Sequence, residues 1–388
     1  MLMNAVSHAQ KRSPALGSAE GNLTQIEYLA LNSPLNLADG HARQDLTPSQ
    51  ASIIDELPSL FLKASEQPVD DLEREAVQSY FHLLGQHSYP AEGGRVLSCY
   101  SSSVAMVILA RALATEIDSV ALIHPTFDNI PDLLRGADLR LVPLPEKELH
   151  EGDLPRKVIE SVGCVFVTTP NNPTGVVLAE ERLRSLAEQC ARSGTILALD
   201  TSFRGFDTRA HYDHYRVLED SGCRWVVIED TGKLWPTLDL KVGWLARSEN
   251  VGLPLAKVYS DVLLGVSPLI LALVKRFAED AAAGGLADLH RFVGEGRTTL
   301  RSALAGIPGI AFPDQDTRAS VERIDLGTRS AMEVWSAVTE HQVYTLPCRK
   351  FHWADPDAGN HSLRVALARS SFTVDAAAAA LRTVLAGT

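Results

Sequence analysis

The sequence predicts an α/β protein with a mainly parallel central sheet. From about residue 104 to about residue 250, apolar runs rich in β-branched residues alternate with segments of helical periodicity, which is typical of parallel strands joined by crossover helices. The chain has 388 residues and is 45% hydrophobic, enough for two domains with a substantial core. Polar residues follow several predicted strands, and open α/β sheets bind ligands beyond the carboxyl ends of their strands.

Individual elements can be assigned in order along this pattern. Apolar residues recur at helical spacing from about residue 55 to 84, and the most apolar stretch, residues 262–274, is shorter than the ~20 residues that span a bilayer, so we expect a buried helix there. The clearest further elements are a helix at 104–113, a strand at 120–124, a helix at 180–192 and a strand at 226–228.

The same pattern suggests a division of the chain. Residues 1–21 lack the apolar core of a signal peptide and are expected to form a mobile tail. An N-terminal segment at 22–54 should cover the active site. A large domain at 55–285 should end in the Ala- and Gly-rich stretch at 281–285 and lead into a smaller α+β domain at 286–388.

Composition excludes several classes of protein. A formal net charge of -12 argues against nucleic acid as a partner. The five cysteines have no metal-ligand spacing, and their odd number gives no disulfide framework. No dinucleotide fingerprint appears among the glycines. We therefore expect a cytoplasmic protein with a small-molecule substrate, no metal and no membrane partner.

Three polar residues follow predicted strands where a parallel sheet would gather them. Asn172 lies in the turn after the run 164–169, Asp200 ends the run 195–200, and Lys233 follows the run 224–230 after a Thr-Gly step. In this order they match the needs of a pyridoxal phosphate (PLP) enzyme: a lysine for the Schiff base, an aspartate for the pyridine nitrogen and an asparagine for the ring hydroxyl.

Each motif also has a structural alternative. Pro-Asn-Asn-Pro-Thr-Gly at 170–175 is a typical turn sequence, and a single Asp or Lys after a strand is more often a surface charge or a helix cap. The serines at 101–103 precede a helix, so they predict a phosphate site or, alternatively, plain N-capping. The combination favours the functional interpretation, because three strand-then-polar units in this order are hard to obtain by accident.

Longer motifs carry a family resemblance. They are residues 22–41, His124-Pro-Thr-Phe-Asp128, residues 198–206 and Glu229-Asp-Thr-Gly-Lys-Leu-Trp-Pro236. From residue 22 onward the chain resembles the fold type I (aspartate aminotransferase-like) PLP-dependent transferases. Within them it is similar to the PLP- and O2-dependent L-arginine oxidases and hydroxylases of the enduracididine-biosynthetic type.

The resemblance implies a set of site residues. Lys233, Asp200 and His41 would be catalytic. The cofactor would be held by Ser101, Ser102, Ser103, Phe127, Asn172, Asp200, Ser202, Lys233 and Lys241. Phe127 would stack on the ring, and the three serines and Lys241 would hold the phosphate. The substrate would be held by Thr24, Glu27, Asp39, Asp230 and Arg364, with Arg364 binding the carboxylate as a bidentate fork.

Three positions depart from the ordinary aminotransferase pattern. Asp230 stands three residues before the lysine, where a phosphate-binding serine is usual, and Lys241 stands eight residues after it, where arginine is usual. Phe203 replaces a tyrosine that donates to the ring oxygen, and Ser202 is the candidate to replace that donor. Since a carboxylate repels phosphate, we expect Asp230 to face a cation such as a guanidinium. His41 follows an Asp-Gly step and would move protons near the bound amino acid.

The resemblance implies oxidation of L-arginine by O2 on PLP, without metal or flavin. The products would be 4-hydroxy-2-oxo-5-guanidinopentanoate, 2-oxo-5-guanidinopentanoate or both, with ammonia and hydrogen peroxide. The alternative is an aminotransferase or a cyclising lyase acting on arginine or a hydroxyarginine, because the electron sink is common to all three. A noncatalytic regulator of the same fold is disfavoured by the complete set of Lys233, Asp200, Asn172 and Arg364. The family also implies a homodimer.

Overall fold

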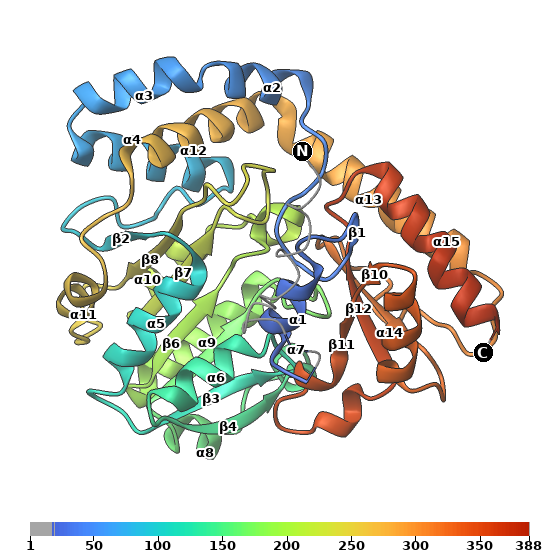
Figure 1. Ribbon diagram of the computed structural model, residues 1–388. Coiled ribbons are helices and arrows are strands. Elements are labelled where there is room, and N and C mark those ends of the chain that lie inside the picture. The colour runs from blue at the N-terminus through green and yellow to red at the C-terminus, as the bar shows by residue number, and fades with distance from the viewer. Residues whose placement is uncertain (1–17, 19, 388) are drawn as a thin grey trace, which may run out of the picture.

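The computed structural model describes residue 18 and residues 20–387. The mobile tail predicted at residues 1–21 therefore falls almost entirely outside the described residues. Figure 1 shows a large sheet flanked by helices, a smaller group of C-terminal strands and helices beside it, and the N-terminal segment between the two.

The central sheet confirms the predicted fold class. It has seven strands in the order β2-β8-β7-β6-β5-β3-β4, and the pairs β7/β8 and β2/β8 are antiparallel whereas the others are parallel. The strands are β2 (Val96–Cys99), β3 (Ser119–His124), β4 (Arg140–Pro145), β5 (Cys164–Thr168), β6 (Ile196–Asp200), β7 (Arg224–Asp230) and β8 (Gly243–Arg247). Strands β5 and β6 are buried along their whole length, as expected for parallel strands covered on both faces.

Helices follow the strands in βα alternation. They are α5 (Ser102–Leu113), α6 (Asn129–Gly136), α7 (Glu146–Glu151), α8 (Arg156–Glu160), α9 (Glu180–Ser193), α10 (His214–Ser221) and α11 (Leu255–Val262). In Figure 1, α5 and α6 lie in front of the sheet. The Ser102 amide at the N-terminus of α5 donates to Asp230 at 2.8 Å, so this helix begins beside the end of β7.

A layer of four helices covers the β2 side of the molecule (Figure 1). It comprises α2 (Pro48–Asp55), α3 (Leu57–Glu66), α4 (Val69–Leu83) and α12 (Pro268–Asp280). The helical pattern at 55–84 is thus two helices separated at Pro68. The prediction of one buried helix at 262–274 is wrong for the first half of this range. Helix α11 ends at Val262, Leu264 is fully exposed, and α12 begins only at Pro268. Proline favours the first turn of a helix, which explains this start. Among the described residues, no helix is long and apolar enough to cross a membrane.

The C-terminal part contains a three-stranded antiparallel sheet, β11-β12-β9, and a parallel pair, β1-β10. Its elements are α13 (Leu286–Leu304), β9 (Val321–Asp325), α14 (Ala331–Glu340), β10 (Val343–Tyr344), β11 (Leu346–Pro347), β12 (Ser362–Ala366) and α15 (Ser371–Gly387). The boundary predicted at residue 285 coincides with a π-helical turn, Ala281–Gly285, between α12 and α13. The division into domains stays a prediction.

The N-terminal segment connects the two parts. Helix α1 (Leu23–Ala30) is followed by β1 (Leu35–Asn36), which pairs with β10. The Leu23 N–H donates to Asp128 at 2.7 Å, and the Ala42 N–H donates to the Gly232 carbonyl at 3.1 Å. These bonds hold residues 22–42 against the loops that follow β3 and β7.

Candidate active site

A cavity of about 850 Å³, including its open mouth, lies at the carboxyl ends of β5, β6 and β7. Every predicted site residue except Asp39 lines it. Phe203, noted in the sequence as a departure from the aminotransferase pattern, lines it as well. Lining residues that the sequence did not single out for the site are Gly40, Met106, Asn129, Ile130 and Thr168. Their small, apolar or common polar side chains carry no distinctive sequence signal.

Lys233 lies in this cavity with its amine unengaged. No hydrogen bond or ion pair reaches its Nζ from any described residue. A Cβ on the preceding Gly232 would lie 2.5 Å from Lys241 Cδ, 3.0 Å from Asp230 Oδ1 and 3.2 Å from His41 Cδ2. These three side chains therefore pack closely around the glycine.

Asp200 ends β6 beside Lys233. Its Oδ1 accepts from the Ser202 amide at 3.0 Å and the Ser202 hydroxyl at 2.6 Å. Burial raises the pKa of Asp200, against the lowering effect of both Ser202 bonds. In the structure the single Ser202 hydroxyl proton is donated to Asp200, and a hydrogen bond from Ser202 to the ring oxygen stays a prediction.

Asp230 caps the N-terminus of α5. Its Oδ2 accepts from the Ser102 amide at 2.8 Å and its Oδ1 from the Gly232 amide at 2.6 Å. Burial acts to raise its pKa, but Lys233, Lys241 and the Ser102 contact outweigh burial and lower it. The expected cationic surroundings are thus present as two lysines, while the carboxylate itself also binds backbone N–H groups. Ser101 caps the same helix by accepting from the Val104 amide.

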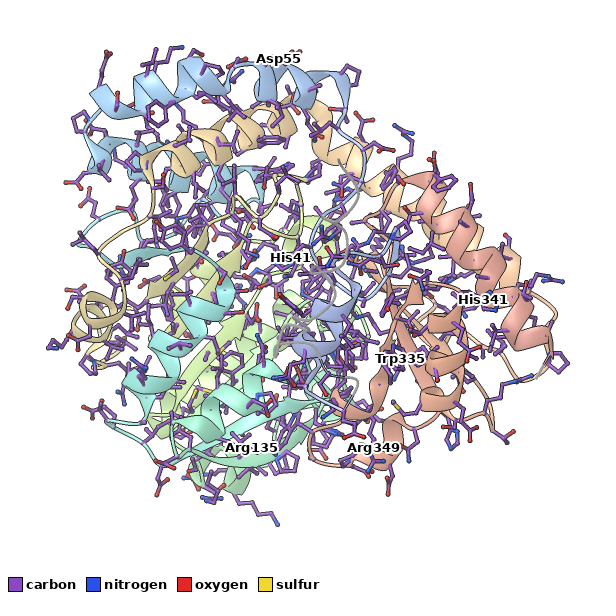
Figure 2. All side chains as sticks on the ribbon, viewed as in Figure 1. His41, Asp55, Arg135, Trp335, His341 and Arg349 are labelled. Carbon is purple, nitrogen blue, oxygen red and sulfur yellow. The ribbon has the colours of Figure 1, made fainter. Side chains whose placement is uncertain are left out.

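His41 lies between an acid and an ammonium group, near the centre of the molecule (Figure 2). Its Nδ1 is 2.6 Å from Asp39 Oδ1, and its Nε2 is 2.5 Å from Lys241 Nζ. Because a carboxylate only accepts and an ammonium only donates, His41 must be the neutral tautomer with its proton on Nδ1. Burial and the charge of Lys233 lower its pKa, consistent with that neutral form.

Asp39 itself lies behind His41 and outside the cavity lining. It is 2% exposed and also pairs with Arg43 at 2.7 Å. Burial acts to raise its pKa, but the hydrogen bond from His41 and the charge of Arg369 hold the pKa well below its usual range. In the structure, Asp39 orients His41 and does not face the cavity.

Arg364 projects from β12 and is fully buried. Its Nη1 donates to the Ala38 carbonyl at 2.6 Å, its Nη2 lies 3.4 Å from Glu27 Oε1, and its Nε has no hydrogen-bond partner among the described residues. Burial raises the pKa of Glu27 to about 7, although Arg364 opposes this. The expected carboxylate-binding arginine is thus paired with a protein carboxylate from α1.

Two buried residues that support the site were missed from the sequence. Arg369 donates to the backbone carbonyls of Asn36, Asp39 and His41 and so holds the turn that carries His41. Asp128 holds the start of α1 through the Leu23 amide. Asp128 ends the motif His124-Pro-Thr-Phe-Asp128, but the sequence shows neither contact, since both join segments more than 100 positions apart.

The residues present fit PLP. Asn172 Oδ1 is buried without a hydrogen-bond partner among the described residues, and no described residue donates to Asp200 Oδ2. Lys233 offers a free amine, and the N-terminus of α5 with Lys241 offers N–H and ammonium donors suited to a phosphate. Asn172, Asp200 and Lys233 are thus open to a ring hydroxyl, a ring nitrogen and an aldehyde. A phosphate would share the Ser102 amide and Lys241 with Asp230 and His41, which they contact in the structure.

The fold and the pocket are those of the fold type I proteins that bind PLP. The model of the aminotransferase class I and II family matches residues 50–381, and the chain belongs to that family. It is 63% identical to MppP in a structure soaked with the product 2-ketoarginine; the match covers 91% of this chain and 100% of that one, with a TM-score of 0.90. The family recognised from the sequence motifs is thereby confirmed.

More distant relatives are aminotransferases. The probable aspartate/prephenate aminotransferase of Aquifex aeolicus is 28% identical over 34% of each chain, and mouse kynurenine--oxoglutarate transaminase 1 is 26% identical over 46% of each chain. The chain therefore spans less than half the length of these curated relatives. Aspartate aminotransferase from Thermus thermophilus with maleate has a TM-score of 0.76 at 16% identity, covering 94% of this chain and 96% of that one. That likeness shows the fold alone.

Proposed function

We propose that this protein is a PLP-dependent L-arginine oxidase that uses O2 as the electron acceptor, without metal or flavin. The products are 2-oxo-5-guanidinopentanoate, 4-hydroxy-2-oxo-5-guanidinopentanoate or both, with ammonia and hydrogen peroxide. The observation that carries the proposal is the 63% identity with MppP, whose structure was soaked with the product 2-ketoarginine. That compound is the 2-oxo acid obtained by deaminating arginine.

The charges of the cavity support this substrate. Arg364 is a buried cation suited to an α-carboxylate, and Glu27 and Asp230 are acids suited to a guanidinium. Thr24 adds a hydroxyl from the same helix as Glu27. An amino acid with a cationic side chain would therefore find a partner for each of its charged ends.

When bound, PLP supplies an electron sink for the carbanion formed at the substrate Cα. Lys233 would carry the cofactor and then, with its amine released, take the Cα proton on Nζ. Asp200 would hold a proton on the ring nitrogen. O2 takes up the electrons and leaves as hydrogen peroxide, and hydrolysis gives the 2-oxo acid and ammonia.

His41 is suited to the hydroxylation that leads to the 4-hydroxy product. Its Nε2 carries the lone pair in the tautomer fixed by Asp39, and a phosphate that engages Lys241 would free this atom. The 4-hydroxy product needs a second two-electron oxidation, in which a second O2 takes two electrons and two protons from the side chain, leaves as hydrogen peroxide and makes Cγ unsaturated. His41 Nε2 would then remove a proton from the water that adds to this Cγ. Asp39 acts as the positioning residue, in the manner of the carboxylate of a catalytic triad.

We also propose that the protein acts as a cytoplasmic homodimer. Exposed large apolar side chains occur next to cavity residues: Tyr100, beside Ser101, is 42% exposed, and Leu238, in the loop between Lys233 and Lys241, is 92% exposed. Such side chains are suited to a subunit contact. Sedimentation equilibrium of the wild type and of Leu238→Asp would test it: the wild type should be a dimer, and a monomeric wild type would refute the assembly.

The reaction can be tested by product analysis. Purified holoenzyme is incubated with arginine in air or under nitrogen, each with and without 2-oxoglutarate, and the products are identified by mass spectrometry. The proposal expects 2-oxo acids in air alone, with or without the acceptor. Product formation under nitrogen that requires 2-oxoglutarate would instead identify an aminotransferase, and an acceptor-independent anaerobic product would identify a lyase.

A further inference from the structure

The pair formed by Arg364 and Glu27 occupies the place where a substrate carboxylate is expected. The Arg364 side chain is 0% exposed and that of Glu27 is 15% exposed, with 3.4 Å between Nη2 and Oε1. Arg364 Nη1 is already bound to the Ala38 carbonyl. A ligand carboxylate that binds Arg364 must therefore compete with Glu27 for the remaining face of the guanidinium.

Displacing Glu27 from Arg364 is costly unless another cation replaces it. A buried carboxylate that loses its ion-pair partner is left without a compensating charge, and for Glu27 only the backbone hydrogen bond from Gly40 would remain among its described contacts. Burial has already raised the pKa of Glu27 to about 7 with Arg364 in place. The charged groups that face Glu27 from neighbouring elements are Arg364, Arg369, Lys233, Asp39 and Asp128. Of the described residues, only Arg364 forms an ion pair with it.

We propose that Glu27 determines specificity by making the Arg364 site selective for ligands that bring a cation together with their carboxylate. Arginine satisfies both partners after they separate, because its carboxylate takes Arg364 and its guanidinium takes Glu27. A 2-oxo acid without a cationic group leaves Glu27 buried and unpaired. The inference rests on the proposed function and deepens it, since the same residue would exclude the simple 2-oxo acids that serve as amino acceptors in transamination.

Two matched ligands test this inference by binding alone. 2-Ketoarginine carries both charges, and 2-oxopentanoate is the same 2-oxo acid without the guanidino group. Dissociation constants for the holoenzyme are measured by titration calorimetry at about pH 8, where a carboxyl with a pKa of about 7 is mostly ionised. The proteins are the wild type, Glu27→Gln, and the control Glu56→Gln, which removes an acid paired with Arg276 on the helical layer.

Glu27→Gln should bind 2-oxopentanoate about tenfold more tightly than the wild type and 2-ketoarginine about tenfold more weakly. Glu56→Gln should change neither constant. A residue that only bound the guanidinium would leave 2-oxopentanoate unaffected, and a purely structural residue would weaken both ligands. Either of these two patterns would overturn the inference.

Proton uptake gives a second readout. In the wild type, Glu27 should take up a proton when 2-oxopentanoate binds. This uptake makes the binding enthalpy depend on the ionisation enthalpy of the buffer. The dependence should vanish in Glu27→Gln. Equal uptake in both proteins would contradict the inference. A failure of the proposed function would look different from a failure of this inference. The wild type would then not bind 2-ketoarginine, whereas 2-oxopentanoate binding could still be compared between the wild type and Glu27→Gln.

Discussion

Lys233 is the residue at which the chemistry should be most sensitive to a small change. Its amine lies in the cavity without a partner among the described residues, so Lys233→Ala removes a reactive group but no hydrogen bond or ion pair. We expect loss of the visible absorbance of the covalently held cofactor and loss of turnover, with an unchanged melting temperature. The control is Lys257→Ala, an exposed lysine on α11. Normal turnover by the Lys233 variant would refute the assignment of the site.

His41 should control the fate of the oxidised intermediate. His41→Ala is expected to keep oxygen uptake but to shift the product from the 4-hydroxy-2-oxo acid to the simple 2-oxo acid, since no base then activates water. Because the pKa of His41 is lowered from 6.5 by burial, the wild-type product ratio should stay constant as the pH rises from about 6.5 to about 8. Mass spectrometry of the products checks both statements; an unchanged ratio in the variant removes His41 from the chemistry.

Asp39 should act through the tautomer of His41. Asp39→Asn replaces the acceptor at His41 Nδ1 by a group that can donate, which favours the tautomer with the proton on Nε2. We expect the same product shift as in His41→Ala with little change in the affinity for arginine. A large rise in KM with an unchanged product ratio would show instead that Asp39 binds the substrate directly.

At the scale of single elements, α5 depends on a close approach to β8. A Cβ on Gly243 would lie 2.5 Å from the Ser101 carbonyl carbon and 2.7 Å from the Ser102 amide nitrogen. Gly243→Ala should therefore push the N-terminus of α5 away from the pocket, destabilise the protein by about 1–3 kcal/mol and weaken cofactor retention. Gly265→Ala, where an added Cβ meets nothing within 4 Å, is the control. Equal cofactor affinity in both variants would disprove the role of this contact.

Helix α1 should dock less firmly as the pH rises. Burial raises the pKa of Asp128 from 3.8 to about 7, so the docked state prefers the protonated acid, and this contribution is lost as the pH rises through about 7. Glu27 on the same helix has a pKa raised to about 7 as well. Limited proteolysis after α1 should be faster at about pH 8 than at about pH 6, and less pH-dependent in Asp128→Asn. A pH-independent cleavage rate in the wild type would contradict this account.

For the whole molecule, the sequence predicted the parallel sheet and the residues that follow its strands, because both depend on local patterns. Asn172, Asp200 and Lys233 were found in this way. The Asp128 contact with α1 and the Arg369 contacts with the turn at His41 were not, because they join segments far apart in the chain. Ser202 lines the pocket, but its hydrogen bond to Asp200 could not be predicted, since the sequence does not show which acceptor takes its proton.

The central claim is that this pocket oxidises arginine with O2, and oxygen uptake measures it most directly. In an oxygen electrode, the wild-type holoenzyme should consume O2 with arginine and release hydrogen peroxide and 2-oxo acid in proportion. Citrulline, which lacks the cationic group, should give little uptake, and Lys233→Ala should give none. An absence of oxygen uptake with arginine, under conditions where the holoenzyme binds it, would contradict the proposed function.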